Sequence, residues 1–130
     1  FRTGAVSSVG ARGLMQVMED TAADIAKALE VENYSFDQLY DAETNVTFGC
    51  YYLGKLSERF RGDPLLVAMA YHAGGTQVQN WLNTSLYSAD GQTILLDNLP
   101  DGPTKQYAVR VKRDFAIYRR LYYDALEDDA

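Results

Sequence analysis

The chain has 130 residues, 47% of them hydrophobic, and a formal net charge of −6. This length suits one globular domain with one core, and the negative charge argues against a general nucleic-acid binder, which needs a basic surface for phosphates. No run of residues is long and apolar enough to cross a bilayer. No signal peptide is visible, and the chain begins with Phe1 rather than Met, so we expect a processed or trimmed piece of a longer protein.

The opening segment, SSVGARGLMQVMEDTA (residues 7–22), places one amide, Gln16, inside an apolar run. Two glycines, Gly10 and Gly13, precede it and allow the chain to turn tightly. From the residues alone, the amide of Gln16 is expected to satisfy neighbouring backbone groups, and Met18 is expected to pack in the core. A ligand contact is the alternative for both.

Helical signals follow along the chain. Asp20 or Thr21 is expected to cap a helix that runs through Leu29. Ser35 and Gln38 have the spacing of a capping box, which predicts one short helical turn.

A longer helix is predicted from Asp41 to Gly62, because its apolar residues recur at steps of three and four. These residues are Val46, Cys50, Leu53, Leu56 and Phe60. Cys50 is the single cysteine, so no internal disulfide forms and the compartment cannot be read from it. Its place on the apolar stripe predicts a buried, inert thiol, and a catalytic pair with His72 is the alternative. With one Cys and one His, a structural zinc site would need carboxylate ligands, which is uncommon.

The second half of the chain also carries helix start and stop signals. Asp63 followed by Pro64 is a strong helix start, and the Gly74-Gly75 pair is expected to end that helix. Thr76 is expected to begin a short helix that carries Val78, Trp81 and Leu82. Residues 88–103 are rich in turn formers and predict a loop, in which residues 93–96 are a candidate extended segment.

A last helix is expected from Thr104, and the tail, residues 127–130, is expected to be frayed. One face of this helix carries Tyr107, Val111, Phe115, Tyr118 and Tyr122. Most of the aromatic residues of the chain are expected to fill the core, and a minority could line a cleft that binds a sugar. With no repeat or linker, the sequence predicts one all-α domain of five to seven helices.

Four blocks, in order, resemble the SLT-type lytic transglycosylases, which belong to the lysozyme superfamily and cut the glycan strands of peptidoglycan. The first block is the opening segment, which resembles the family's Ser-x-x-Gly-Ala-x-Gly-Leu-Met-Gln motif. The others are DAETNVTFGCYYL (residues 41–53), AMAYHAGGTQVQNWL (residues 68–82) and LPDGPTKQYAVRV (residues 99–111). The resemblance as a whole covers residues 1 to about 122, and it implies a lysozyme-like helical domain of the goose-type lysozyme and lytic transglycosylase kind.

The resemblance also implies a set of site residues. Gln16 would contact the substrate, Met18 would line the sugar cleft, and Ser7 would lie near the catalytic acid. Ala70, Tyr71 and Tyr107 would each face the cleft, although Tyr71 could instead be a helix-end aromatic residue packed on the core. Two positions depart from the family pattern: His72 replaces the usual Asn, and Pro103 stands where the family often has Glu.

The family's catalytic acid is the glutamate of a Glu-Ser-x-Phe motif, and Phe1 fits the phenylalanine of that motif. The glutamate would then lie three residues before Phe1, together with the helix that carries it. We therefore expect an SLT-like domain, residues 1–130, that is incomplete at its N-terminus and holds no catalytic residue itself. Four glutamates inside the chain are poor substitutes, because nothing in their sequence surroundings suggests a raised pKa: Glu19, Glu30, Glu43 and Glu58.

The implied reaction is non-hydrolytic cleavage of the β-1,4 bond between N-acetylmuramic acid and N-acetylglucosamine, which leaves 1,6-anhydro ends. It implies peptidoglycan strands as the partner, no metal or cofactor, no nucleic acid, and a location in the periplasm or cell envelope. Two alternatives remain open: a lysozyme-type muramidase that hydrolyses the same bond, and a peptidoglycan-binding module without catalysis.

Overall fold

The computed structural model describes residues 2–124 and is all-α, as the sequence predicts, with no strand among those residues. The expected match of Phe1 to the family motif and the expected fraying of residues 127–130 lie outside the described residues. The chain divides into two compact units, residues 1–55 and 56–130, which are described separately. The single-domain organisation stays a prediction. Within the described residues no helix combines the length and the apolar content that a membrane span requires.

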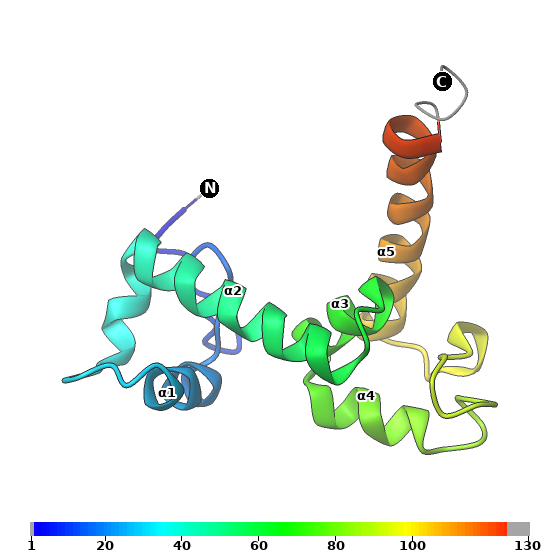
Figure 1. Ribbon diagram of the computed structural model, residues 1–130, viewed down its shortest axis with the longest axis horizontal. Coiled ribbons are helices and arrows are strands. Elements are labelled where there is room, and N and C mark those ends of the chain that lie inside the picture. The colour runs from blue at the N-terminus through cyan, green and yellow to red at the C-terminus, as the bar shows by residue number, and fades with distance from the viewer. Residues whose placement is uncertain (1, 125–130) are drawn as a thin grey trace. The chain divides into compact units, whose positions relative to one another are not determined.

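In the first unit, a turn-rich segment leads into α1 (Glu19–Ala28), followed by a 3-10 helix, η1 (Phe36–Tyr40), and then by α2 (Ala42–Arg59). Figure 1 shows this succession in blue through cyan to green. The predicted cap of α1 is wrong. Its N-cap is Met18, which makes no side-chain capping bond, and Asp20 lies inside the first turn, where a carboxylate stabilises the helix through its dipole.

The short turn at η1 is confirmed, with one change in its hydrogen bonding. The Ser35 hydroxyl accepts from the backbone N–H of Asp37 at 3.3 Å, rather than from that of Gln38. The N–H of Gln38 bonds instead to the Ser35 carbonyl. The start predicted for α2 also holds, because the Asp41 carboxylate accepts from the N–H and the hydroxyl of Thr44, both at 2.9 Å.

The buried face predicted for this segment is confirmed only in part: Leu56 and Phe60 are buried as expected, whereas the earlier positions differ. Cys50 is exposed, so the expected buried thiol is wrong, and Val46 is 41% exposed. The core side instead carries Asn45, Phe48 and Gly49. Asn45 and Gly49 are thus buried, although the pattern of apolar residues predicts both on the surface. The first core forms around Phe48 and the following buried side chains: Val17, Ala22, Ile25, Ala26 and Leu39.

In the second unit, α3 (Pro64–Ala73) begins as predicted, with the Asp63 carboxylate accepting from Leu65 N–H at 3.0 Å and from Leu66 N–H at 3.1 Å. Gly74 ends α3 with φ of 89°, a conformation that favours glycine. The next helix, α4 (Gly75–Leu82), starts at once, one residue earlier than expected. Its Val78 and Leu82 are buried, as are Leu66 and Met69 of α3.

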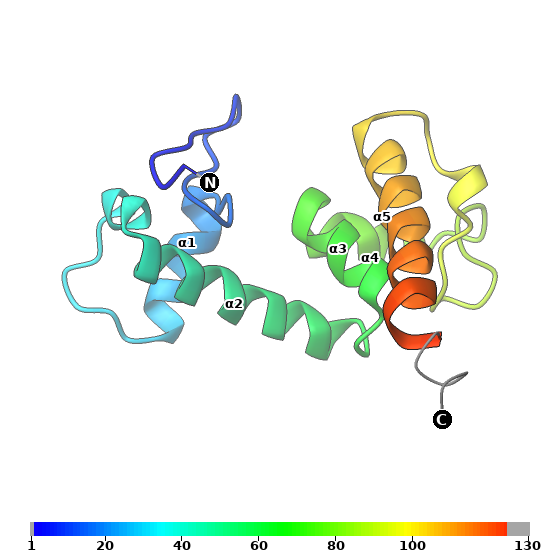
Figure 2. The same ribbon diagram turned by 90° about the horizontal axis from the view of Figure 1, so that it is seen from above.

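Residues 83–102 form the predicted loop, with one 3-10 turn, η2 (Leu96–Asn98), and no strand at residues 93–96. Next comes α5 (Pro103–Arg119), followed by a π-helical turn, η3 (Arg120–Asp124). Figure 2 shows α3 on one side of α5 and the loop on the other, and α5 contacts both α3 and η2.

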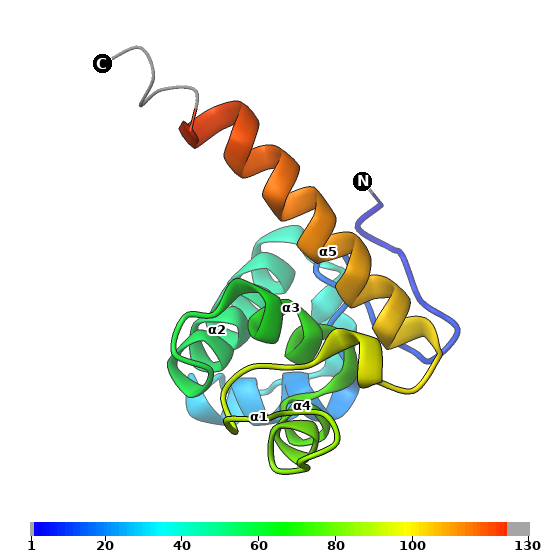
Figure 3. The ribbon, with the colours of Figure 1, turned by 90° about the vertical axis from the view of Figure 1, so that its right-hand side faces the viewer.

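The C-terminal half of α5 extends beyond α3 and α4 (Figure 3). The predicted aromatic face therefore divides into two parts. Tyr107 and Val111 are half-buried, whereas Phe115, Tyr118 and Tyr122 are more than half exposed. The expectation that aromatic residues at helical spacing fill the core fails for this part of the helix.

Candidate functional site

The opening segment is held in shape by backbone hydrogen bonds to itself. The N–H of Arg12 bonds to the Val17 carbonyl at 2.9 Å, and the N–H of Val17 returns the bond to Arg12 at 3.0 Å. The chain between them, residues 13–16, therefore closes into a tight loop, which we call the Gln16 loop. Ser7 supports the turn before it, because its hydroxyl accepts from the N–H of Ala11 at 3.0 Å.

Gln16 stands at the end of this loop in a left-handed conformation, with φ of 49°. Such a φ is uncommon for a residue other than glycine, and it costs about 1–2 kcal/mol. The Nε2 of Gln16 donates to the Gly13 carbonyl at 2.7 Å and to the Ala5 carbonyl at 3.4 Å. The backbone-satisfying role expected from the residues alone is therefore present. Because both bonds use Nε2, the side-chain oxygen keeps its acceptor capacity for a ligand.

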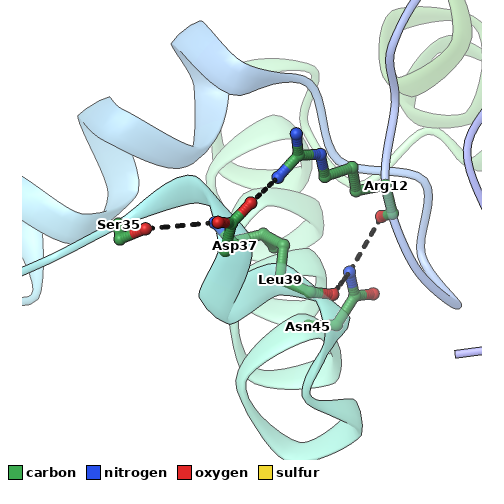
Figure 4. A network of polar contacts seen from close by, with 5 residues as sticks. All are labelled: Arg12, Ser35, Asp37, Leu39 and Asn45. Carbon is green, nitrogen blue, oxygen red and sulfur yellow. Dashed lines mark hydrogen bonds and ion pairs between the residues drawn. The ribbon is translucent and has the colours of Figure 1, made fainter. Parts of the chain in front are cut away.

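The loop rests on one buried amide, Asn45 of α2 (Figure 4). Asn45 is 1% exposed. Its Nδ2 donates to the carbonyls of Arg12 at 2.8 Å and Leu39 at 2.9 Å, and its Oδ1 accepts from the N–H of Met15 at 2.7 Å. Gly13 packs directly against this side chain, so a Cβ at Gly13 would overlap the amide of Asn45 and lie 2.6 Å from the Leu39 carbonyl oxygen. Gly13 also has φ of 76°, so both space and backbone conformation require glycine.

Arg12 anchors the start of the loop through its side chain. Its Nη1 donates to the Asp37 carboxylate at 2.7 Å. The guanidinium also lies over the rings of Phe36, at 3.9 Å from the centroid, and Tyr40, at 4.8 Å. A planar cation can stack on aromatic rings and form an ion pair at the same time, which suits Arg better than Lys.

A pocket of about 330 Å³ adjoins the loop, and Met18 contributes to its lining. Met18 is 42% exposed, so the expectation that it packs in the core is wrong. The pocket has an apolar part and a rim of charged side chains, and its other lining residues are Val6, Val9, Gly10, Arg12, Glu19, Asp20 and Phe36. An apolar methionine beside polar groups is the kind of lining that small-molecule sites have.

Near this pocket the hydroxyl of Tyr34 is buried, and it has no hydrogen-bond partner among the described residues. Burial raises the pKa of Tyr34, the charge of Glu19 adds to the rise, and Arg12 opposes it. The phenol therefore stays neutral. It packs its ring on Phe48, with 6.0 Å between the ring centroids.

The other predicted site residues lie in the second unit. Ala70 is fully buried, so its methyl packs in the core and leaves no exposed area with which to face a cleft. Tyr71 is half-buried near the end of α3, and Tyr107 is half-buried in α5. His72, the departure from the family pattern, stacks on Tyr107 with 4.5 Å between ring centroids and an interplanar angle of 16°. Thr104 Oγ1 lies 3.5 Å from the Nδ1 of His72.

Two carboxyl groups, those of Asp41 and Asp90, do not suit a general acid, which needs a raised pKa. The pKa values of Asp41 and Asp90 are both lowered, chiefly by hydrogen bonds from the backbone N–H groups of Thr44 and of Gln92, respectively. Glu19 and Glu43 lie in the first turns of α1 and α2, as expected. Residues 2–124 contain no group of three or more His, Cys, Asp or Glu side chains placed to hold a metal ion.

Sequence reasoning missed three contributors to these sites. Asn45 gave a weak signal, as a polar residue in the helical block that resembles the family. Arg12 and the His72–Tyr107 stack gave none, because their partners are 25 to 35 residues away in the chain. A second pocket of about 640 Å³, between η2 and α5, contains none of the predicted site residues.

Comparison with known proteins places these features in a family. The model of the transglycosylase SLT domain family matches residues 1–93. The soluble lytic murein transglycosylase of Escherichia coli K12 is 35% identical over 119 residues, which is 91% of this chain and 18% of that protein. A protein of Haemophilus influenzae, named a putative soluble lytic murein transglycosylase, is 33% identical over 127 residues, or 95% of this chain and 20% of that protein.

Solved structures of lytic transglycosylases are also similar to this chain in fold and sequence. The 70 kDa soluble lytic transglycosylase of Escherichia coli has a TM-score of 0.73 and 33% identity, covering 94% of this chain and 20% of that one. The complex of the 70 kDa soluble lytic transglycosylase with bulgecin A has a TM-score of 0.74 at 32% identity, with the same coverage. An inactive Glu-to-Gln mutant of the lytic transglycosylase Slt from Pseudomonas aeruginosa has a TM-score of 0.67 at 33% identity, covering 83% of this chain and 17% of that one.

The chain thus spans about a fifth of the length of the curated relatives that it matches. Within that span, the family model includes the Gln16 loop, the buried Asn45 and the α3 residues Ala70 and Tyr71. The chain belongs to the transglycosylase SLT domain family.

Proposed function

We propose that this chain is part of a lytic transglycosylase that cleaves the β-1,4 bond between N-acetylmuramic acid and N-acetylglucosamine in peptidoglycan and leaves 1,6-anhydro ends. The observation that carries the proposal is the Gln16 loop. The loop lies within the match to the transglycosylase SLT domain family, and its Gln16 keeps an amide oxygen with acceptor capacity. Arg12 and Met18, on either side of the loop, line a pocket. A carbonyl oxygen and an apolar thioether together suit the hydroxyls and the apolar face of a sugar ring.

The chemistry needs one glutamic acid, which we place upstream of Phe1. Kept protonated by an apolar setting, it donates its proton to the glycosidic oxygen. The same carboxylate then takes the proton of the muramoyl C6 hydroxyl, whose oxygen closes the anhydro ring. Retaining glycosidases normally use a second carboxylate as nucleophile, and here the substrate's own acetamido group takes that role. The reaction requires no metal or cofactor.

The proposal assigns substrate contacts to Ser7, Gln16 and Met18 in the first unit, and to Tyr71 and Tyr107 in the second. Ala70 is fully buried, so we place it in the core rather than against the sugar. The proposal also includes a single SLT-like domain over residues 1–130 and a location in the periplasm or cell envelope, where peptidoglycan is found. The partner is the glycan strand.

The test compares three proteins on purified peptidoglycan. One begins at Phe1, one adds the upstream segment with its glutamate, and one carries glutamine at that position. We expect anhydromuropeptides from the second only, because general acid catalysis is typically worth ~10²–10⁴-fold. The glutamine variant should match the second protein in melting temperature and still bind the strands.

Mass spectrometry of the products separates the alternatives. Reducing ends in place of anhydro ends would identify a muramidase, and binding without any cleavage by the second protein would identify a binding module. Anhydro products from the protein that begins at Phe1 would show that a carboxylate inside the chain is the acid, and the site as proposed would be wrong.

A further inference from the structure

Asn45 is a fully hydrogen-bonded amide in an otherwise apolar core. Leu39 and Phe48 lie in the same core, and Asn45 is less exposed than the latter, at 1% against 2%. Burying an amide is favourable only when its hydrogen bonds are made, and here both ends of the group are paired. A leucine at this position would fill the space without that requirement. The polar residue is therefore explained by the three backbone groups that it holds.

One of those groups, the Met15 N–H, lies in the Gln16 loop, and another, the Arg12 carbonyl, lies immediately before it. The bonds to the Arg12 carbonyl and the Met15 N–H connect α2 to residues that are 33 and 30 positions away. They lie at either side of Gly13, whose missing Cβ leaves the space that the amide fills. The loop can therefore shift only if these bonds break.

Gln16 depends on the shape of this loop. Its left-handed φ of 49° is costly, and the surrounding structure must enforce it. Its Nε2 is held by the Gly13 carbonyl, and Gly13 is the residue that packs on Asn45. A continuous set of contacts thus runs from the core of the first unit to the side chain that we place against substrate.

We infer that Asn45 is a positioning residue: it sets the conformation in which Gln16 meets the substrate, without touching the substrate itself. This inference rests on the proposed function for its kinetic test. Misplacing a substrate-binding group by about 1 Å can cost up to ~100-fold in rate. A loss of the Asn45 bonds should therefore reduce kcat/KM by about tenfold or more, mainly through a higher KM.

The test uses the full-length protein, assayed well below its melting temperature so that every variant is folded. Asn45→Ala leaves three buried backbone groups unpaired and can cost too much stability. Asn45→Ser is the second variant, because its small hydroxyl side chain admits water to those groups. The matched control is Asn98→Ser in the second unit, where the amide makes one exposed bond of 2.8 Å to the Leu86 carbonyl. The control should leave kcat/KM within about twofold of wild type.

A double-mutant cycle with Gln16→Ala distinguishes positioning from general stability. If Asn45 acts through Gln16, Asn45→Ser should have almost no further effect on kcat/KM in the Gln16→Ala background. Independent, multiplying effects would overturn the inference, as would a lower melting temperature with unchanged kcat/KM.

Hydrogen exchange gives a readout that does not depend on activity. Asn45→Ser should speed exchange at the amides of Met15 and Val17 much more than at those in α1. Equal acceleration throughout the first unit would overturn the inference. If the wild-type protein forms no anhydro ends, the proposed function fails, and this exchange pattern still decides the role of Asn45.

Discussion

At the scale of single residues, the backbone conformation of Gln16 lowers the stability of the protein, while its side chain serves the proposed function. The left-handed backbone costs free energy that a glycine at the same position would not pay. The residue keeps a side chain there, and the amide both closes the loop on Gly13 and presents an acceptor. Strain of this kind is typical of functional sites.

Gln16→Gly and Gln16→Ala should therefore differ in stability but not in activity. Both remove the amide, but only alanine keeps the penalty of a Cβ at φ of 49°, so the glycine variant should be more stable by about 1 kcal/mol. Denaturant unfolding measures the difference, and both variants should bind peptidoglycan fragments more weakly than wild type. An alanine variant as stable as the glycine variant would show that the loop relaxes away from the left-handed conformation.

Tyr71 offers a second test at this scale. If its hydroxyl positions the catalytic acid or the acetamido group, Tyr71→Phe in the complete protein should lose most activity while its melting temperature hardly changes. The ring stays in place in this variant, so packing is kept. Activity and melting temperature falling together would assign Tyr71 to core packing.

At the scale of elements, α2 and α3 begin where short-range signals place them. Asp41 and Asp63 accept hydrogen bonds from N–H groups two or three residues ahead, and these bonds satisfy donors that a helix start leaves unpaired. At α1 such a cap is missing, and the chain enters the helix through Met18. The cap is absent because the side chain of methionine has no oxygen that could accept a bond from the first N–H groups of the helix.

The Asp41 cap should make stability depend on pH. The hydrogen bonds from Thr44 lower the pKa of Asp41 in the folded protein below its unfolded value. The stabilisation is therefore complete above the unfolded pKa, about 3.9, and is lost as the pH falls through the lower folded pKa. Asp41→Asn keeps the acceptor but does not titrate, so its unfolding free energy should decline less than that of wild type in this acid range. Parallel pH curves for the two proteins, measured by urea unfolding, would contradict the assignment.

At the scale of the whole molecule, α5 is the helix that its unit leaves least covered. Its first turns pack against α3. Farther along α5 and η3, six apolar side chains are at least half exposed: Phe115, Ile117, Tyr118, Leu121, Tyr122 and Tyr123. Tyr118 and Tyr122 stack on each other, with 5.7 Å between their ring centroids. Exposed apolar side chains concentrated in this way on one helix end are unusual on a soluble monomer.

The 130-residue chain should accordingly bind a hydrophobic dye such as ANS in its native state. The double variant Phe115→Ser/Tyr118→Ser should reduce the dye fluorescence severalfold while the melting temperature changes little, because both side chains are more than half exposed. Val78→Ser, at a fully buried position of α4, is the contrasting variant and should lower the melting temperature. Unchanged fluorescence in the double variant would place the dye site elsewhere.

What the sequence by itself determined is local. The starts of α2 and α3, the short turn at η1 and the end of α3 at Gly74 follow from side chains within a few residues of the backbone groups that they pair. The family blocks likewise identify the loop that carries Gln16. Tertiary structure alone decided three other features. These are the burial of Asn45 and Gly49 of α2 in place of Val46 and Cys50, the residue of α5 at which the aromatic stripe leaves the core, and the lack of space for a Cβ at Gly13. Those features depend on contacts between residues about 30 positions apart, such as Asn45 with Met15, and no local spacing encodes which distant segment a helix face will meet.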